Sequence, residues 1–172
     1  MQEKIDKLPG DYIAGFVDGE GCFYLMYRSE TKLNRNNAPK YFRWIPYFAI
    51  TLRADDIEIL NMIKNTLSCG NVYLCKNGTV QYFIQNVDDL YNKAVPFFQT
   101  YPLRAKKRGD YALWQEALTI VYHKKINKLK YSQEDHKKLL DIRKKMRFIK
   151  SKQNRDYTNS PILDDVQPSL YD

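Results

Sequence analysis

The 172-residue sequence predicts an α+β fold with one antiparallel sheet and helices on one face. The first observation is the order of the predicted elements, which is helix, two strands, helix, two strands, helix. The second is Asn77-Gly78, a strong hairpin signal between two strand-like segments. The third is a composition of 44% hydrophobic and 28% charged residues, which is typical of globular chains. We expect one domain over 1–150 and an extended, polar C-terminal tail over 151–172.

The first predicted helix follows Pro9 and carries an unusual small strip. Ile13, Phe16 and Val17 have the spacing of one apolar helix face. Gly15 lies inside the same helix, where glycine costs about 1 kcal/mol relative to alanine. A close approach by another backbone would explain that cost. The strip therefore predicts a contact surface between two helices.

The end of this helix carries acidic residues where the helix dipole disfavours them. Asp18 and Glu20 lie near the negative end, and Gly19 and Gly21 flank Glu20. The glycines permit a tight exit with an exposed carbonyl group. Carboxylates beside bare carbonyl oxygens favour a hard divalent cation such as magnesium.

The next predicted elements are two strands, over 22–29 and 41–52, joined by a polar loop over 30–40. Pro46 lies inside the second strand and cannot donate a ladder hydrogen bond. We therefore expect an edge position or a bulge at Pro46.

A helix and a hairpin are expected next. Asp55 and Glu58 have the spacing of a capping box, and Gly70 is expected to end the helix. Strands over 71–76 and 79–86 form the hairpin around Asn77-Gly78.

Three further helices are predicted. The first begins at Asp88-Asp89, runs to about residue 101 and is kinked by Pro96. Asp110 is expected to cap the second, which follows a basic turn over 103–108. Ser132 and Asp135 resemble the capping box of the third.

The charge balance limits the possible partners. The net charge is +8 and the pI is about 9.3, which favours nucleic acid or an anionic membrane surface. No apolar run approaches the length of a membrane span, so we expect no membrane partner. The N-terminus does not resemble a signal peptide, and the three cysteines are expected to be reduced thiols. These features predict an intracellular, non-secreted protein.

Residues 13–21, Ile-Ala-Gly-Phe-Val-Asp-Gly-Glu-Gly, resemble the signature helix of LAGLIDADG homing endonucleases. The resemblance implies an αββαββα core with additional C-terminal helices and a saddle-shaped sheet that binds DNA. It also implies that two signature helices pack across a two-fold axis. The run occurs once in the sequence, so we expect self-association as a homodimer. The expected interface residues are Tyr12, Ile13, Gly15, Phe16 and Asp18.

The resemblance also implies a catalytic site. Glu20 would be the catalytic carboxylate and metal ligand, assisted by the Gly19 carbonyl. Magnesium would be the cofactor, and manganese or calcium would substitute in binding. Counting along the sequence gives Lys106, and then Lys107, as the catalytic-pocket lysine; phosphate binding or a solvated basic turn is the alternative. Many relatives carry a glutamine where this chain has Leu52, which puts the outer water network in doubt.

The implied activity is double-strand cleavage of a long, pseudo-palindromic DNA target, with short 3′ overhangs. The compartment would be an organelle or a bacterial or archaeal cytoplasm, and the activity would belong to a mobile intron. An RNA maturase that binds intron RNA, or a non-catalytic DNA-binding regulator, are the alternatives on the same fold.

Strand alternation predicts which side chains face DNA. Arginine and lysine can read guanine in the major groove, and glutamine can read adenine. The expected DNA contacts are Tyr24, Met26, Arg28, Glu30, Lys32, Arg35, Lys40, Arg43, Tyr47, Arg53, Tyr73, Cys75, Lys76, Gln81, Phe83 and Gln85. Ten lysines and arginines between 124 and 147 are expected to contact phosphates without specifying sequence.

Overall fold

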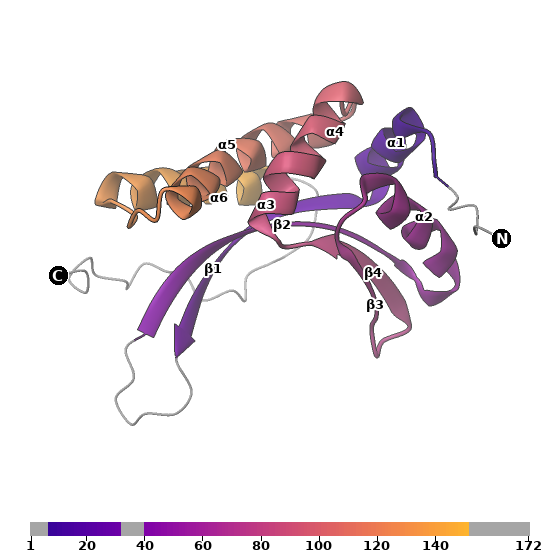
Figure 1. The fold of residues 1–172 in the computed structure, drawn as a ribbon, viewed down its shortest axis with the longest axis horizontal. Coiled ribbons are helices and arrows are strands. Elements are labelled where there is room, and N and C mark those ends of the chain that lie inside the picture. Colours follow the sequence, from indigo (N-terminus) through magenta and orange to yellow (C-terminus); the bar gives the residue numbers. More distant parts are fainter. Residues whose placement is uncertain (1–6, 32–39, 152–172) are drawn as a thin grey trace.

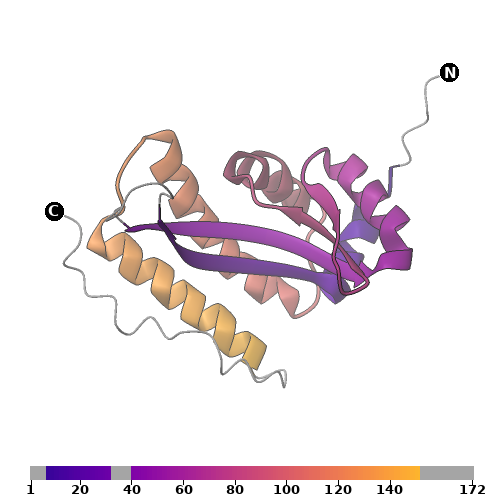
Figure 2. The ribbon, with the colours of Figure 1, turned by 90° about the horizontal axis from the view of Figure 1, so that it is seen from below.

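The computed structural model describes residues 7–31 and 40–151, and for 29–31, 40, 41 and 147–151 the backbone alone. An antiparallel sheet has the strand order β1 (Gly21–Thr31), β2 (Lys40–Arg53), β4 (Thr79–Ile84), β3 (Asn71–Leu74). The sheet arches, and the helices lie on its convex side (Figure 1). Seen from below, the strands pass in front of α5 (Lys107–Ile126) (Figure 2). The α+β prediction is confirmed. Apart from Ser151, the expected C-terminal tail lies outside the described residues.

The first two helices differ in how well their ends were predicted. α1 (Gly10–Glu20) follows Pro9, as expected. α2 (Ile57–Leu67) follows a 3-10 turn, η1 (Ala54–Asp56), and the predicted capping box is wrong. Asp55 instead accepts a 3.0 Å hydrogen bond from the Arg53 guanidinium. Ser68, rather than Gly70, takes the left-handed position that ends α2, with φ of 54°.

The helical segment after β4 changes from a π-helical to an α-helical turn just before Pro96, where a break or kink is predicted. It comprises α3 (Val87–Asp89), a π-helical turn η2 (Leu90–Ala94) and α4 (Val95–Thr100). Pro96 has no N–H for the usual helical bond, so a wide turn directly before it has a local cause. Asn86 caps the segment by accepting N–H bonds from Asp88 and Asp89.

The last two helices are α5 (Lys107–Ile126) and α6 (Gln133–Ser151). α6 has the predicted capping box, in which Ser132 Oγ accepts the Asp135 N–H at 3.1 Å. Asp135 Oδ2 in turn accepts the Ser132 N–H at 2.7 Å. The prediction that Asp110 caps α5 is wrong, because α5 begins before it and Asp110 is buried within the first turn.

Pro46 fits the sheet because of where β4 ends. It pairs with Leu25 of β1, whereas pairing between β2 and β4 starts only at Phe48. β2 therefore has a single neighbouring strand at Pro46, which confirms the edge-like position expected from the missing N–H.

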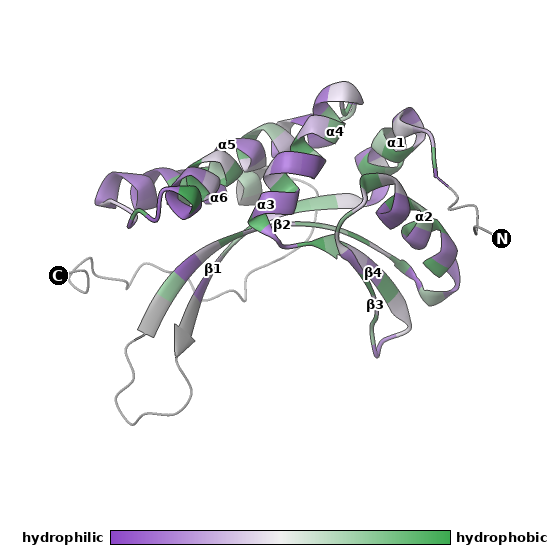
Figure 3. Ribbon diagram, in the orientation of Figure 1, coloured by the Kyte–Doolittle hydropathy of each residue, from purple (hydrophilic) through white to green (hydrophobic). Residues whose placement is uncertain are grey.

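The core lies between the sheet and the helices. Phe23 of β1 packs against Phe48 of β2 with ring centroids 5.0 Å apart. Its ring also contacts Trp114 of α5 at 5.1 Å and Tyr111 at 5.3 Å. Hydrophobic and hydrophilic residues alternate along the helices, as expected where one helix face packs on a sheet (Figure 3). Among the described residues, no helix combines the length and apolarity needed to cross a bilayer.

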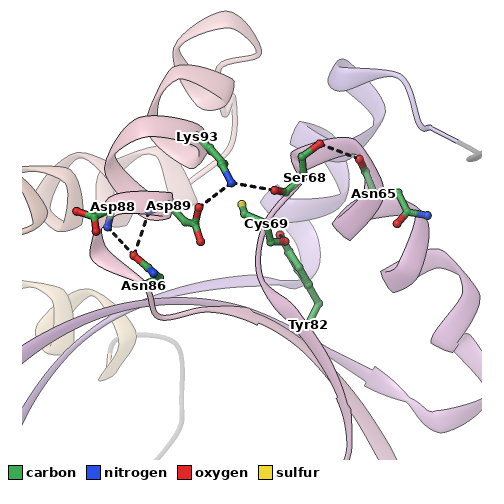
Figure 4. Close-up of polar contacts among 8 residues, drawn as sticks. All are labelled: Asn65, Ser68, Cys69, Tyr82, Asn86, Asp88, Asp89 and Lys93. Atoms are coloured by element: carbon green, nitrogen blue, oxygen red, sulfur yellow. Dashed lines mark hydrogen bonds and ion pairs between the residues drawn. The ribbon is translucent and has the colours of Figure 1, made fainter.

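Polar contacts join the end of α2 to β4 and to the π-helical turn (Figure 4). Tyr82 of β4 donates its hydroxyl to the Cys69 carbonyl at 3.0 Å. Lys93 of η2 donates to the Ser68 carbonyl at 3.0 Å and pairs with Asp89 at 2.7 Å. A cation at this position also offsets the negative end of the α2 dipole.

Candidate active site

The acidic end of α1 is balanced by a cation from a distant part of the chain. Glu20 is the last residue of α1 and is exposed, and the last turn of α1 holds no basic residue. Lys107 at the start of α5 donates its ammonium to the Gly19 carbonyl at 3.2 Å and to the Gly21 carbonyl. A positive charge here compensates both the helix dipole and the neighbouring carboxylates.

Asp18 connects α1 to the basic turn before α5. Its Oδ2 accepts the backbone N–H of Arg104 at 2.7 Å and that of Ala105 at 3.1 Å. Its Oδ1 is buried and accepts no hydrogen bond from the described residues. Lys106, which counting along the sequence gives first as the catalytic-pocket lysine, is exposed at the N-cap of α5. Lys107 is the lysine that contacts the end of α1.

The donor atoms around Glu20 fit a hard cation. They are a carboxylate and the Gly19 carbonyl, both oxygen donors. Within the described ranges, no group of three or more His, Cys, Asp or Glu side chains could hold a metal ion. Among the described residues, this position therefore offers one carboxylate and one carbonyl oxygen. Magnesium is commonly bound by one or two carboxylates together with phosphate oxygens and water, so a phosphate-bearing partner would suit this donor set.

The glycines around Glu20 have different steric roles. A Cβ on Gly21 would lie 2.8 Å from the Val17 carbonyl oxygen, so the exit from α1 requires a glycine there. A Cβ on Gly15 or Gly19 would meet no atom within 4 Å. Their small size is therefore not required by packing among the described residues.

The expected interface residues divide into two groups. Tyr12 is 50% exposed, Phe16 is half-buried, and their rings lie 6.2 Å apart on one side of α1. Ile13 is fully buried in the core of its own chain, which corrects its assignment to the surface of α1. The Asp18 carboxylate is bound within the chain as described above.

The concave face of the sheet carries a row of aromatic side chains. Tyr24, Tyr47 and Phe83 come from β1, β2 and β4, with ring separations of 6.0 and 5.6 Å. Tyr47 donates to Gln81 at 2.8 Å, and Gln81 donates to Thr51 at 2.9 Å. Burial, and then the nearby Cys75 thiol, raise the pKa of Tyr47.

Two arginines from the predicted set lie opposite each other on this face. Arg28 of β1 pairs directly with Arg43 of β2 in the sheet register, and both side chains are exposed. Two guanidinium groups that face each other in this way suit an anionic ligand. A hollow of about 320 Å³ is lined by Arg28, Arg43, Trp44, Ile45, Gln85, Asn86 and Val87.

Strand alternation predicts the side of the sheet on which a residue lies more reliably than it predicts the exposed fraction of that residue. Alternation places Ile45 and Ala49 on the same side as Tyr47, yet they are only 6% and 2% exposed. It places Leu74 on the same side as Val72, yet Leu74 is 55% exposed on β3, an edge strand. Thr51 was missed, although continuing the alternation of β2 would have found it. Leu52 packs against the core with Val80 as its cross-strand partner.

The remaining predicted DNA contacts have varied settings. Tyr73 and Gln85 are exposed, and Met26 and Cys75 are half-buried. Lys76 is exposed in the hairpin turn. Lys32 and Arg35 lie outside the described residues, and Glu30 and Lys40 lie at strand ends where the backbone alone is described.

Comparison with known proteins finds a family profile and several relatives that match this chain. A LAGLIDADG endonuclease family profile matches residues 13–118. A "Probable intron-encoded DNA endonuclease 1" of Mycosarcoma maydis is 32% identical over 108 residues, which are 63% of this chain and 36% of the relative. The chain thus spans about a third of that relative's length.

Two solved structures share the fold. The homing endonuclease I-TnaI is 24% identical, with a TM-score of 0.67, and the match covers 85% of this chain and 98% of that one. I-SmaMI, bound to an uncleaved DNA target in the presence of calcium ions, is 24% identical with a TM-score of 0.69. That match covers 81% of this chain and 45% of I-SmaMI.

Proposed function

This chain belongs to the LAGLIDADG endonuclease family, and we propose on that premise that it is a homodimeric, site-specific, double-strand DNA endonuclease. The observation that carries the proposal is the end of α1. There the ammonium of Lys107 from α5 donates to the carbonyl groups of Gly19 and Gly21, the two residues that flank the exposed Glu20. A carboxylate and a fixed cation at one exposed position are suited to hydrolysis of a phosphodiester bond.

The concave face supports DNA as the substrate. Besides its aromatic row, this face carries Gln81, Thr51 and the Arg28–Arg43 pair. They supply amide, hydroxyl and guanidinium groups. Arginine and glutamine are the side chains that read guanine and adenine in the major groove. We propose that this face reads the bases of a long, pseudo-palindromic target.

Self-association would complete the site. Gly15 and Gly19 leave open space along α1, and Tyr12 and Phe16 provide apolar surface beside it. The match covers 98% of I-TnaI but only 45% of I-SmaMI. A unit of about half the length of I-SmaMI that works in pairs would give these coverages. Two copies joined through α1 would bring two Glu20 carboxylates to one position, and so one site for each DNA strand.

Each residue of the site has a proposed role in cleavage. Glu20 and the Gly19 carbonyl would hold a divalent ion, magnesium by preference. When bound, that ion would stabilise the attacking and leaving oxygens of the phosphodiester. The Lys107 ammonium would place positive charge beside the phosphate, and Lys106 would contact the backbone from its exposed position. We propose staggered cuts with short 3′ overhangs.

Leu52 favours a second candidate function. Its side chain packs on the core, at the position where the family resemblance implies a glutamine that orders water. A chain without that group could bind nucleic acid and not cut it, as a maturase on intron RNA would. We place either activity inside the cell, where intron nucleic acid is found.

A substitution at Glu20 tests the proposed function. Duplex DNA with a randomised central segment is first selected for binding to the chain in calcium, and the selected target is cloned into a plasmid. Wild-type protein should then linearise the plasmid in magnesium and stop when the metal is chelated. E20Q should bind the target within about threefold of wild type and lose at least about 100-fold in single-turnover rate.

Asp56→Asn is a matched control, since it removes an exposed carboxylate from the turn before α2. It should cut at the wild-type rate. Full cleavage by E20Q would refute the catalytic assignment. Binding without cutting by wild-type protein, together with tighter binding to intron RNA, would favour the maturase.

A further inference from the structure

A closed chain of contacts links Asp18 to Lys107. Asp18 Oδ2 holds the N–H groups of Arg104 and Ala105, which lie 86 and 87 residues away in sequence. Lys107 follows two residues after Ala105, and its ammonium returns to the Gly19 and Gly21 carbonyls. The path therefore begins at Asp18 and returns to the adjacent residue Gly19 and to Gly21, at the end of α1.

We infer that Asp18 is a positioning residue whose carboxylate fixes the turn before α5 and thereby holds the Lys107 ammonium beside Glu20. The inference rests on the proposed function only for its effect on cleavage. The geometric part concerns the free chain and needs neither DNA nor metal.

Asp18 ties Arg104 and Ala105 of this turn to α1. The buried Leu103 and the hydrogen bond from the Arg108 N–H to the Ala105 carbonyl also hold the turn. Arg104, Ala105 and Lys106 are all exposed. The Asp11–Arg104 ion pair is 3.9 Å long with both side chains exposed, and such pairs contribute little. By contrast, hydrogen bonds from backbone N–H groups to a carboxylate are short and charge-assisted.

The second oxygen of Asp18 indicates that the residue serves more than stability. Oδ1 is buried and accepts no hydrogen bond from the part of the chain that the structure describes. Burying such an oxygen is unfavourable. An unfavourable group beside a candidate active site is expected where the arrangement of that site depends on it.

Differential amine labelling tests the position of Lys107 in the free protein. Lys106 is adjacent and exposed, so it is an internal control within one peptide. In wild type, an amine-reactive ester should modify Lys107 at least about fivefold more slowly than Lys106, because the Lys107 ammonium is hydrogen-bonded. D18A should remove this difference, and D18N should preserve it because the amide oxygen can accept the same N–H groups.

Equal rates for Lys107 and Lys106 in wild type, or a preserved difference in D18A, would overturn the inference. Equal loss in D18N and D18A would also overturn it, because the charge and not the accepted hydrogen bonds would then be responsible. Should D18A fail to fold, amide exchange in wild type decides the question. The Arg104 and Ala105 amides should be protected from hydrogen exchange although both residues are exposed. Unprotected exchange would contradict their hydrogen bonds to Asp18.

Cleavage gives a further readout once a target has been selected. D18A should lower the single-turnover rate by the same factor as K107A and leave DNA affinity unchanged, and the double variant should lose no more than either single one. The single-turnover rate of D18N should stay within about threefold of wild type, because its amide oxygen can still accept the two backbone N–H groups. Additive losses in the double variant would contradict the inference. If wild-type protein does not cut DNA, the proposed function fails, while labelling and amide exchange still decide the role of Asp18.

Discussion

Single side chains join distant parts of this molecule, and Trp44 with His136 is the clearest case. Trp44 of β2 donates its indole N–H to Nδ1 of His136 on α6 at 3.0 Å. This bond requires a ring whose Nδ1 carries no proton. The rings of Tyr27 and Tyr131 also pack against His136, and Lys124 pairs with the adjacent Asp135. Burial raises the pKa of Tyr131 to about 12, so its hydroxyl stays neutral near pH 7.

The pH dependence of stability should therefore report on His136. Burial lowers the pKa of His136 below its usual 6.5, and the charge of Asp135 opposes that shift only in part. A histidine with a lowered pKa in the folded state loses stability as the pH falls below its unfolded value, until the folded pKa is passed. We expect the free energy of unfolding to fall more between pH 8 and pH 5 in wild type than in H136Q.

Denaturant midpoints at the two pH values measure this effect. H123Q is the matched control, because His123 is exposed on α5 and is the other of the chain's two histidines. It should keep the wild-type pH dependence. The same change with pH in H136Q and wild type would contradict the argument.

At the scale of elements, a few polar bonds determine how the β3–β4 hairpin meets α2. Tyr82 is fully buried, and its hydroxyl bonds to the Cys69 carbonyl just after the left-handed end of α2 at Ser68. Burial is the main cause that raises the pKa of the Tyr82 hydroxyl, which therefore remains a donor at all ordinary pH values. The bond joins β4 to the α2–β3 connection.

Tyr82→Phe should destabilise the protein by about 1–2 kcal/mol, because the buried Cys69 carbonyl loses its donor. Chemical denaturation measures the change. Tyr73→Phe removes a hydroxyl from the same hairpin at a residue that is 56% exposed, and it should change stability by less than about 0.5 kcal/mol. Equal effects of the two substitutions would show that the Tyr82–Cys69 bond is unimportant.

The exposed surface of α1 is the surface through which we propose that two copies associate. Leucine at Gly15 should stabilise the single chain by up to about 1 kcal/mol through helix propensity, because a Cβ there meets open space. The same side chain would separate two copies packed through α1. We therefore expect G15L to shift the sedimentation profile from dimer to monomer while the variant remains folded.

Gly109→Leu is the comparison for that experiment, since Gly109 is also an exposed helical glycine whose Cβ would meet no atom within 4 Å. It lies on α5, so the dimer should persist. A monomeric wild-type protein, or a dimer unaffected by G15L, would rule out the proposed association through α1.

At the scale of the whole molecule, positive charge is concentrated away from the aromatic row of the sheet. Residues 123–147 contain ten lysines and arginines against three acidic residues, a net +7 of the chain's +8. Ion pairs engage some of these lysines, for example Lys138 with Glu116 at 2.9 Å and Lys145 with Asp141 at 2.7 Å. Lys137 and Lys144 are exposed and seven residues apart, so they share one side of α6. The distribution predicts that phosphate contact and base reading can be separated.

K137Q/K144Q should weaken binding to the selected target and to random DNA by the same factor. Each lost phosphate contact lowers the salt slope of log K by about 0.9, so the slope should fall by about 1.8. K7Q/K64Q makes the same charge change near α1 and α2 and should leave the slope unaltered. Loss of target preference in K137Q/K144Q would show instead that these lysines read sequence.

The sequence alone determined the features whose cause lies within a few residues. The signature helix, the hairpin at Asn77-Gly78, the Ser132–Asp135 capping box and the change of helical turn before Pro96 depend on local periodicity, φ values or a missing N–H group. The strand faces followed from alternation in the same way. Glu20 could be proposed because its motif is contiguous.

Only the tertiary structure decided the features that depend on contacts between distant parts of the chain. It placed Lys107 rather than Lys106 at the end of α1, gave Asp18 its partners in the turn before α5, and buried Ile13 in its own core. Local propensity also failed at Asp55, where Arg53 competes for the carboxylate, and at Ser68, where the connection to β3 ends the helix early. These contacts are set by how distant elements pack together, and no local pattern in the sequence records that packing.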